Sequence, residues 1–286
     1  NKKTDSKKSV SRETRNVEAD WYSQKCINSG KIPKRCFLLS IKGSVVVRIL
    51  CIANQKGGVG KTTTAINLAA SLGQAGCKTL LVDLDPQCNS TTGLGLEPTD
   101  RHPLVQQQPI ASAIHTTDFE NLDMLPGSRS FQDVSILADG KPSQAESLRH
   151  HISNSTTAYD MVLIDCPPSV GPLTQSALAA STEVFMPIQC EYFAMEGLTQ
   201  MIHVIRDVMQ VENSKLEFGG IVLTMYDPAL ELTGEVDQEV REFFGDIVFD
   251  TVIPRDTLLA EAPSYGKPIL EYAPRSRGAR AYTELC

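Results

Sequence analysis

One eight-residue run, Lys-Gly-Gly-Val-Gly-Lys-Thr-Thr at positions 56–63, constrains the fold of this chain more than any other feature. An apolar stretch, Ile49–Ala53, precedes the run, and a helical pattern, Ala65–Ala70, follows it. A strand, a glycine-rich turn and a helix N-terminus form a phosphate cradle, because backbone N–H groups and the helix dipole both favour an anion there. Such a P-loop predicts that Lys61 reaches the β- and γ-phosphates of a nucleotide and that the Thr62 hydroxyl binds Mg²⁺. The predicted nucleotide-binding residues of the loop are Lys56, Gly57, Gly58, Val59, Gly60, Lys61, Thr62 and Thr63.

The chain beyond the P-loop alternates between strand-like and helix-like patterns. This alternation predicts a mostly parallel, twisted sheet with helices on both faces, and hence an α/β P-loop NTPase fold. Ligands bind such sheets at the carboxyl ends of the strands, and the P-loop, Asp85 and Asp165 all fall at that edge. The expected strands, besides the one before the P-loop, cover 78–85, 161–165, 184–188, 220–224 and 247–253, and helices are expected at 195–209 and 235–244.

Three aspartates follow apolar runs and are candidates for chemistry. Asp165 comes after four apolar residues, as a Walker B aspartate does, and is expected to hold Mg²⁺ through water together with Thr62. The alternative is an aspartate that caps the next helix. Asp83 and Asp85 are two residues apart, so on an extended strand they point to the same side. The alternative for this pair is two solvated carboxylates before a Pro-containing turn.

An ordinary P-loop does not require the lysine that opens the run. With Lys56, the loop resembles the deviant Walker A motif of the ParA, MinD and nitrogenase-iron-protein group of P-loop ATPases. The resemblance implies that Lys56 reaches the nucleotide of a partner subunit, and therefore that ATP drives formation of a homodimer. The alternative is a solvated loop lysine.

Other segments resemble the Soj/ParA proteins that partition chromosomes and plasmids. Asp83–Thr91 is similar to their switch I, which implies that Asp85 positions the attacking water and that Asp83 supports the metal or the strand end. Asp165–Pro168 is similar to their switch II. Segments at 187–198, 224–227, 251–255 and 261–268 extend the resemblance over essentially all of 47–286. The implied site comprises Lys56, Lys61 and Asp85 as catalytic residues, Thr62, Asp83 and Asp165 at the metal, and Pro254 and Arg255 at the nucleotide.

Binding to DNA rests on fewer residues. The chromosomal members usually carry an arginine where this chain has Leu258, and they are basic where it has Pro228–Leu232. The remaining candidates for contacts with DNA phosphates are Arg255, Arg275, Arg277 and Arg280, and the alternative is that these arginines are solvated or helix-end charges.

The charge of the chain is unevenly distributed. Residues 1–46 contain 11 Lys+Arg and 4 Asp+Glu, a net charge of +7. Because the whole chain has a net charge of −7, residues 47–286 carry −14. This basic segment has few apolar positions, so we expect a disordered extension. We interpret it as a translated upstream region, with Val47 as the initiator, or as a non-functional extension; the alternative is a native basic tail that binds nucleic acid. The eight cysteines show no CxxC pair, and no apolar run approaches the roughly 20 residues of a membrane span, so we expect a reduced cytosolic protein.

Taken with the resemblance, these features predict a DNA-segregating ATPase. It would use ATP and Mg²⁺, form an ATP-dependent homodimer on non-specific DNA, and be stimulated by a ParB-like centromere-binding protein. The nucleoid would be its location when ATP is bound. Two alternatives remain open: an ATPase of the same group that positions a protein cargo, and a nucleotide-dependent scaffold with little turnover.

Overall fold

The computed structural model describes residues 47–106, 108–133, 148–149, 151–152, 158–192, 194–210 and 215–286, without the side chains of 132, 133 and 196. The expected extension at 1–46 lies outside these residues. In the described part, seven strands form one sheet in the order β3-β4-β2-β5-β1-β6-β7, and only the β3–β4 pair is antiparallel. The predicted mostly parallel α/β fold is therefore confirmed. The strands are β1 (Arg48–Ile52), β2 (Thr79–Asp83), β3 (His115–Thr116), β4 (Leu122–Leu125), β5 (Met161–Asp165), β6 (Glu183–Gln189) and β7 (Glu217–Thr224).

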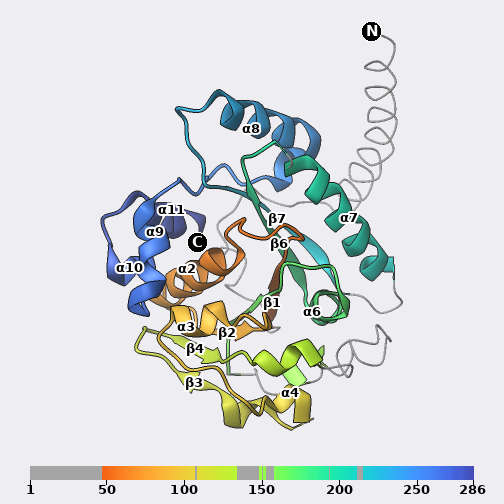
Figure 1. Cartoon of the computed structure of the whole chain (residues 1–286), viewed down its shortest axis with the longest axis vertical. Coiled ribbons are helices and arrows are strands. Elements are labelled where there is room, and N and C mark those ends of the chain that lie inside the picture. Colours follow the sequence, from red (N-terminus) through yellow and green to blue (C-terminus); the bar gives the residue numbers. More distant parts are fainter. Residues whose placement is uncertain are drawn as a thin grey trace.

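Helices cover both faces of the sheet (Figure 1). Alternate residues of β1 point to opposite faces: Ile49 and Cys51 belong to one apolar cluster, and Leu50 and Ile52 to the other. The first cluster includes α6 (Pro172–Ala180), α7 (Ala194–Gln210) and α8 (Glu231–Phe244). The second includes α2 (Lys61–Gln74), α9 (Thr257–Glu261), α10 (Ile269–Tyr272) and α11 (Arg277–Leu285). The shorter helices are α3 (Asn89–Gly93), α4 (Pro103–Gln106), η2 (Ile110–Ala113), η3 (Arg129–Asp133), η4 (Gly245–Ile247) and η5 (Ala262–Tyr265).

The C-terminal helix α11 packs against the P-loop helix α2. Tyr282 of α11 is almost completely buried, and its hydroxyl lies 3.1 Å from that of Thr64 in α2. Asn67 of α2 accepts a hydrogen bond of 2.7 Å from the backbone N–H of Ile269. The end of the chain is thus attached to the helix that follows the phosphate loop.

The expected strand at 247–253 is wrong. The structure has the 3-10 helix η4 up to Ile247 and only isolated bridges, from Val248 to Ile221 and from Pro254 to Tyr226. The N–H of Phe249 donates to the carbonyl of Ile221, and the N–H of Ile253 donates to that of Leu223. The segment therefore advances four residues where β7 advances only two. The surplus residues arch away from β7, and a continuous ladder cannot form.

Other boundaries also differ from expectation, and β7 begins at Glu217, three residues before its predicted start. The strand predicted at 78–85 ends at Asp83, and α8 begins at Glu231, four residues before the predicted start. None of the helices described by the structure is long and apolar enough to cross a membrane.

Candidate nucleotide-binding site

The P-loop has the predicted strand–loop–helix arrangement. Gly58 and Gly60 adopt φ values of 74° and 87°, a left-handed conformation that glycine reaches without strain, and Gly60 caps the N-terminus of α2. The hydroxyl of Thr224, at the end of β7, donates to the carbonyl of Val59 across 2.8 Å. The loop is therefore held against the sheet, and Thr62 and Thr63 lie in the first turn of α2, where backbone N–H groups remain for an anion.

The Lys61 side chain is buried within the loop that it belongs to. Its Nζ donates to the backbone carbonyl of Lys56 across 3.0 Å. Burial lowers the pKa of Lys61, whereas the charges of Asp165 and Asp85 act in the opposite direction. The ammonium thus lies near two carboxylates at the carboxyl edge of the sheet, where the phosphates of a nucleotide are expected.

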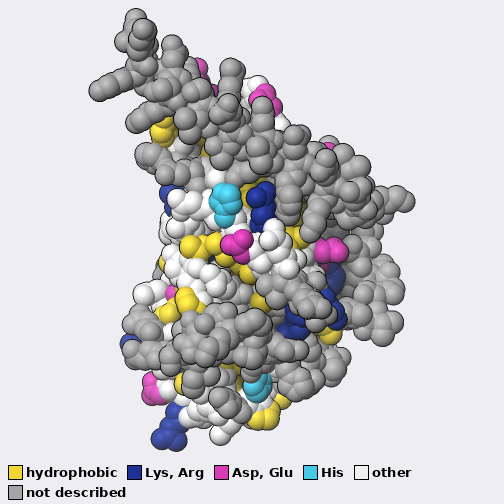
Figure 2. All heavy atoms as spheres, turned by 90° about the vertical axis from the view of Figure 1, so that its right-hand side faces the viewer, with side chains coloured by type: hydrophobic (Ala, Val, Ile, Leu, Met, Phe, Trp, Pro, Cys, Tyr) yellow, Lys and Arg dark blue, Asp and Glu magenta, His cyan; other side chains and the backbone are white. Residues whose placement is uncertain are grey.

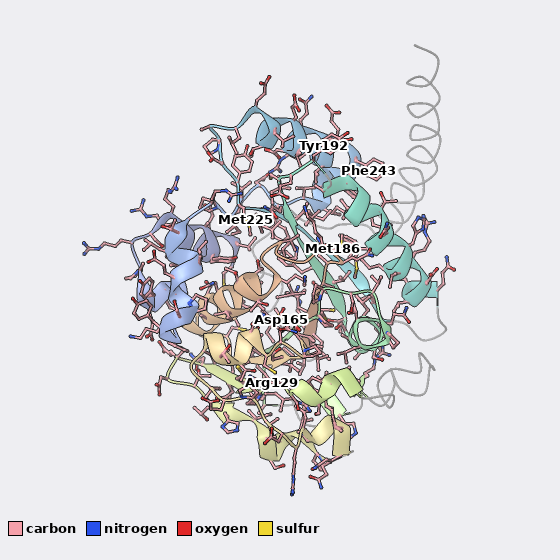
Figure 3. All side chains as sticks on the ribbon, viewed as in Figure 1. Arg129, Asp165, Met186, Tyr192, Met225 and Phe243 are labelled. Atoms are coloured by element: carbon pink, nitrogen blue, oxygen red, sulfur yellow. The ribbon has the colours of Figure 1, made fainter. Side chains whose placement is uncertain are left out.

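Asp165, at the end of β5, lies near the centre of the molecule (Figure 3) and is completely buried. Oδ2 accepts a hydrogen bond of 2.6 Å from the Ser90 hydroxyl, and Oδ1 has no partner among the described residues. Burial and the charge of Asp83 raise the pKa of Asp165 to about 7. The hydroxyls of Ser90 and Thr62 act in the opposite direction, because they donate to the charged carboxylate.

A buried carboxylate oxygen without a partner, close to a hydroxyl, suits Mg²⁺, which prefers oxygen ligands and retains several waters. In the described part of the chain, no group of three or more His, Cys, Asp or Glu side chains could hold a metal. The protein residues therefore fit a Mg²⁺ ion that takes its remaining oxygens from a nucleotide and from water.

Both carboxylate oxygens of Asp83 accept hydrogen bonds from backbone or hydroxyl donors. Oδ1 accepts from the N–H of Asp85 at 3.1 Å, and Oδ2 accepts from the N–H and hydroxyl of Thr91 at 2.9 and 2.7 Å. The Thr91 hydroxyl in turn accepts from the Gly127 N–H at 2.8 Å. Burial raises the pKa of Asp83 to about 6, and the Thr91 donors oppose this shift. Of its two expected roles, these contacts fit support of the strand end.

Asp85 lies beyond the end of β2, so the extended-strand geometry expected for Asp83 and Asp85 does not extend to it. It is almost completely buried, and Oδ1 accepts from the N–H of Gln87 at 2.9 Å. The segment then enters α3 through Cys88, which has a left-handed φ of 55°. This turn brings Ser90 to Asp165 and Thr91 to Asp83. The sequence alone indicates no individual role for Ser90 or Thr91, because it does not show which strand end each side chain faces.

Lys56, at the opening of the loop, pairs with a carboxylate of the same chain. Its Nζ lies 2.8 Å from Oε2 of Glu191, which follows β6. Sequence reasoning included Glu191 in a segment of family resemblance without giving it a function.

The predicted DNA-binding arginines are all exposed. Arg277 donates to the backbone carbonyl of Arg255 at 3.1 Å, so two of the four lie together. The carboxylate of Asp256, between them, accepts from the N–H groups of Leu258 and Gly278. Pro254 and Arg255 lie beside Tyr226, just beyond the end of β7. Pro254 forms an isolated bridge with Tyr226, and the N–H of Arg255 donates to the Tyr226 carbonyl. Figure 2 shows the other side of the molecule, away from α9–α11, and there the coloured basic, acidic and apolar side chains are interspersed.

Known proteins resemble the chain in both sequence and fold. A family model described as an AAA domain matches residues 47–218. The sporulation initiation inhibitor protein Soj of Bacillus subtilis is 45% identical over 243 residues, which are 83% of this chain and 96% of Soj. The chromosome partitioning protein ParA of Myxococcus xanthus is 43% identical over 247 residues, which are 85% of this chain and 87% of that protein.

The chain belongs to the ParA/Soj family of partitioning ATPases. The family resemblance stated from sequence is thus confirmed. Among solved structures, cobyrinic acid a,c-diamide synthase from Mycobacterium smegmatis, with bound ADP and magnesium, has a TM-score of 0.72 and 32% identity, and the match covers 84% of this chain and 92% of that one. This ParA/Soj family member therefore shares its fold with a P-loop enzyme whose structure contains a nucleotide and a metal.

Proposed function

We propose that this ParA/Soj family member segregates DNA through a cycle of ATP binding, dimerisation and hydrolysis. The observation that carries the proposal is the convergence of the phosphate loop, Lys61 and the carboxylates of Asp85 and Asp165 at one edge of the sheet. Phosphoryl transfer needs positioning and charge stabilisation more than covalent chemistry, and these groups supply both. The protein would act in the cytoplasm and associate with the nucleoid when ATP is bound.

Each residue has a distinct role in the proposed site. The N–H groups of the P-loop and the Lys61 ammonium would bind the phosphates, and Pro254 and Arg255 would contact the nucleotide. Thr62 and Asp165 would hold Mg²⁺, which neutralises phosphate charge when bound. Asp83 would fix the end of β2, so that Asp85 orients the attacking water.

Dimerisation would supply the remaining positive charge. Lys56 would leave its own subunit and reach the ATP of a second copy, as the family resemblance implies. Basal turnover would be low, because hydrolysis awaits a ParB-like partner that stimulates it.

DNA binding would follow from dimerisation. The residues beyond 46 carry a net charge of −14, so attraction to DNA must be local. Two copies of Arg255, Arg275, Arg277 and Arg280 on one dimer would double a patch that is weak alone. Phosphate contacts position a protein without specifying bases, so the binding should be independent of sequence.

Retention of the ATP-bound dimer on duplex DNA tests this function. The chain should begin at Val47, because the basic segment 1–46 could bind DNA by itself, and Asp85→Ala should trap the dimer. If about four phosphates are neutralised, log K should fall with log[salt] at a slope of roughly −3 to −4. Absence of retention at low salt would exclude segregation through DNA binding.

A second function is favoured by one specific observation. Leu258 and the segment 228–232 lack the positive charge that the family resemblance implies in regions near DNA. An ATPase that positions a protein cargo would need no such charge, and this function would lead if DNA is not retained. A scaffold with little turnover would instead show no phosphate release with or without DNA.

A further inference from the structure

Lys56, the lysine proposed to act across the dimer, forms an ion pair within its own chain. Its Nζ and Oε2 of Glu191 are 2.8 Å apart, although the two residues are 135 positions apart in sequence. The side chains are 32% and 46% exposed, so the pair lies at the surface, where another charged molecule can compete for either group. It connects the P-loop to the end of β6.

Glu191 is oriented independently of Lys56. Its other carboxylate oxygen, Oε1, accepts a hydrogen bond from the side-chain amide of Gln189, the last residue of β6. Its backbone carbonyl accepts from the N–H of Ala194, the first residue of α7, at 2.8 Å. A carboxylate just before a helix N-terminus is also favoured by the helix dipole. The acceptor for Lys56 is thus already in place.

The backbone of Lys56 is anchored separately from its side chain. Its N–H donates to Oδ1 of Asn54 at 3.0 Å, and Nδ2 of Asn54 donates to the carbonyl of Pro187 in β6 at 2.8 Å. Its carbonyl accepts from Lys61 at 3.0 Å. Release of the ammonium from Glu191 therefore requires side-chain rotation and the loss of one ion pair, without a change of the loop backbone.

We infer that Glu191 is a positioning residue that holds the Lys56 ammonium in the single chain and competes for it with the ATP of a second copy. The inference rests on the proposed ATP-dependent dimer. In the proposed dimer the Lys56 ammonium leaves Glu191 for a phosphate at the site of the second copy, so each symmetric dimer that forms breaks two such pairs. Glu191 would accordingly set how readily ATP-bound chains associate.

The expected size of the effect follows from the exposure of the pair. Partly exposed ion pairs change an equilibrium about 1.4- to 5-fold. Because a symmetric dimer breaks two of them, removal of the Glu191 charge should lower the dimer dissociation constant about 2- to 30-fold.

Glu191→Gln is the appropriate substitution. It preserves the size of the side chain and an oxygen that accepts from Gln189, and it removes the charge that pairs with Lys56. Glu183→Gln is the control, since Glu183 is the first residue of β6, the strand that Glu191 follows. It pairs with Arg48 at 2.6 Å, at the end of the strands opposite to the P-loop.

The dimer dissociation constant should be measured by analytical ultracentrifugation with Mg²⁺ and a non-hydrolysable ATP analogue, alongside the melting temperature of each variant. Glu191→Gln should dimerise more tightly than the parent, and Glu183→Gln should equal it. If the parent dimerises and Glu191→Gln dimerises equally or more weakly, the inference about Glu191 is overturned, and the proposed ATP-dependent dimer stands. A parent that stays monomeric would overturn both.

A second readout detects the ion pair without dimerisation. An amine-acylating reagent, followed by mass spectrometry, reports how fast Lys56 reacts in the nucleotide-free protein. Lys56 should react about 1.4- to 5-fold faster in Glu191→Gln and at the parent rate in Glu183→Gln. Equal rates in all three proteins would show that Glu191 does not hold the ammonium in solution.

Discussion

Ser90 donates its hydroxyl to Oδ2 of Asp165 across 2.6 Å and thereby attaches the helix after β2 to the end of β5. Both side chains are completely buried, and the second oxygen of Asp165 has no partner in the described part of the chain. The bond fixes the direction of the carboxylate and leaves Oδ1 without a protein donor, where the proposed Mg²⁺ would bind. It also makes the position of Asp165 depend on the segment that carries Asp85.

Ser90→Ala should destabilise the protein in the absence of nucleotide and Mg²⁺. Removal of the hydroxyl leaves Oδ2 of a completely buried carboxylate without its Ser90 donor, which should lower the free energy of unfolding by about 1–3 kcal/mol. Urea denaturation measures this loss. Thr92→Ala is the control, because the Thr92 hydroxyl donates only to carbonyls at the start of its own helix. An equal loss in both variants would contradict a specific role for the Ser90–Asp165 bond.

Lys61→Ala should abolish ATP binding. The phosphates would lose the buried ammonium that lies within the P-loop. Titration with a fluorescent ATP analogue measures the affinity, and the melting temperature establishes that the variant folds. Binding at the parent affinity would remove Lys61 from the proposed site.

Asp85→Ala should bind ATP as the parent does and hydrolyse it very slowly. The carboxylate proposed to orient the attacking water would be absent, whereas the phosphate loop would be intact. The variant should therefore accumulate as a dimer, which light scattering with ATP and Mg²⁺ detects. A variant that remains monomeric would argue against the assignment of Asp85 to hydrolysis.

Lys56→Ala should retain ATP affinity, since Lys61 remains, and lose ATP-dependent dimerisation and partner-stimulated hydrolysis. The reason is that Lys56 is the group proposed to cross the interface. Size-exclusion chromatography with ATP and Mg²⁺ distinguishes the two states. If the variant dimerises as readily as the parent, Lys56 is a loop charge paired only with Glu191.

His102 should contribute to acid sensitivity. Its side chain is completely buried against Phe131, and burial lowers its pKa to about 4. The unfolded chain takes up a proton near pH 6.5 and the folded chain does not, so stability is full above that pH and falls as the pH approaches 4. The difference in unfolding free energy between the parent and His102→Gln should narrow by about 3 kcal/mol from pH 7 to pH 4. A difference that does not change with pH would be inconsistent with a buried, neutral His102.

The sequence alone determined the phosphate loop, the α/β class and the family. These features are local, since a strand, a glycine turn and a helix start are written in consecutive residues, and a buried parallel strand is a short apolar run. Asp165 could be placed at the end of its strand for the same reason. The sequence also indicated Asp83 and Asp85 as candidate residues, but it did not show which groups donate hydrogen bonds to them.

Only the tertiary structure decided which groups meet at the site. β2 and β1 both lie beside β5, and this order brings Ser90 to Asp165 across 75 residues of chain. The position of β6 next to β1 brings Glu191 to Lys56 across 135 residues. The tertiary structure also decided that residues 249–253 lie opposite only residues 221–223 of β7 and so form no strand. The physical reason is that strand neighbours are selected by the burial of both sheet faces together, and no single segment contains that information.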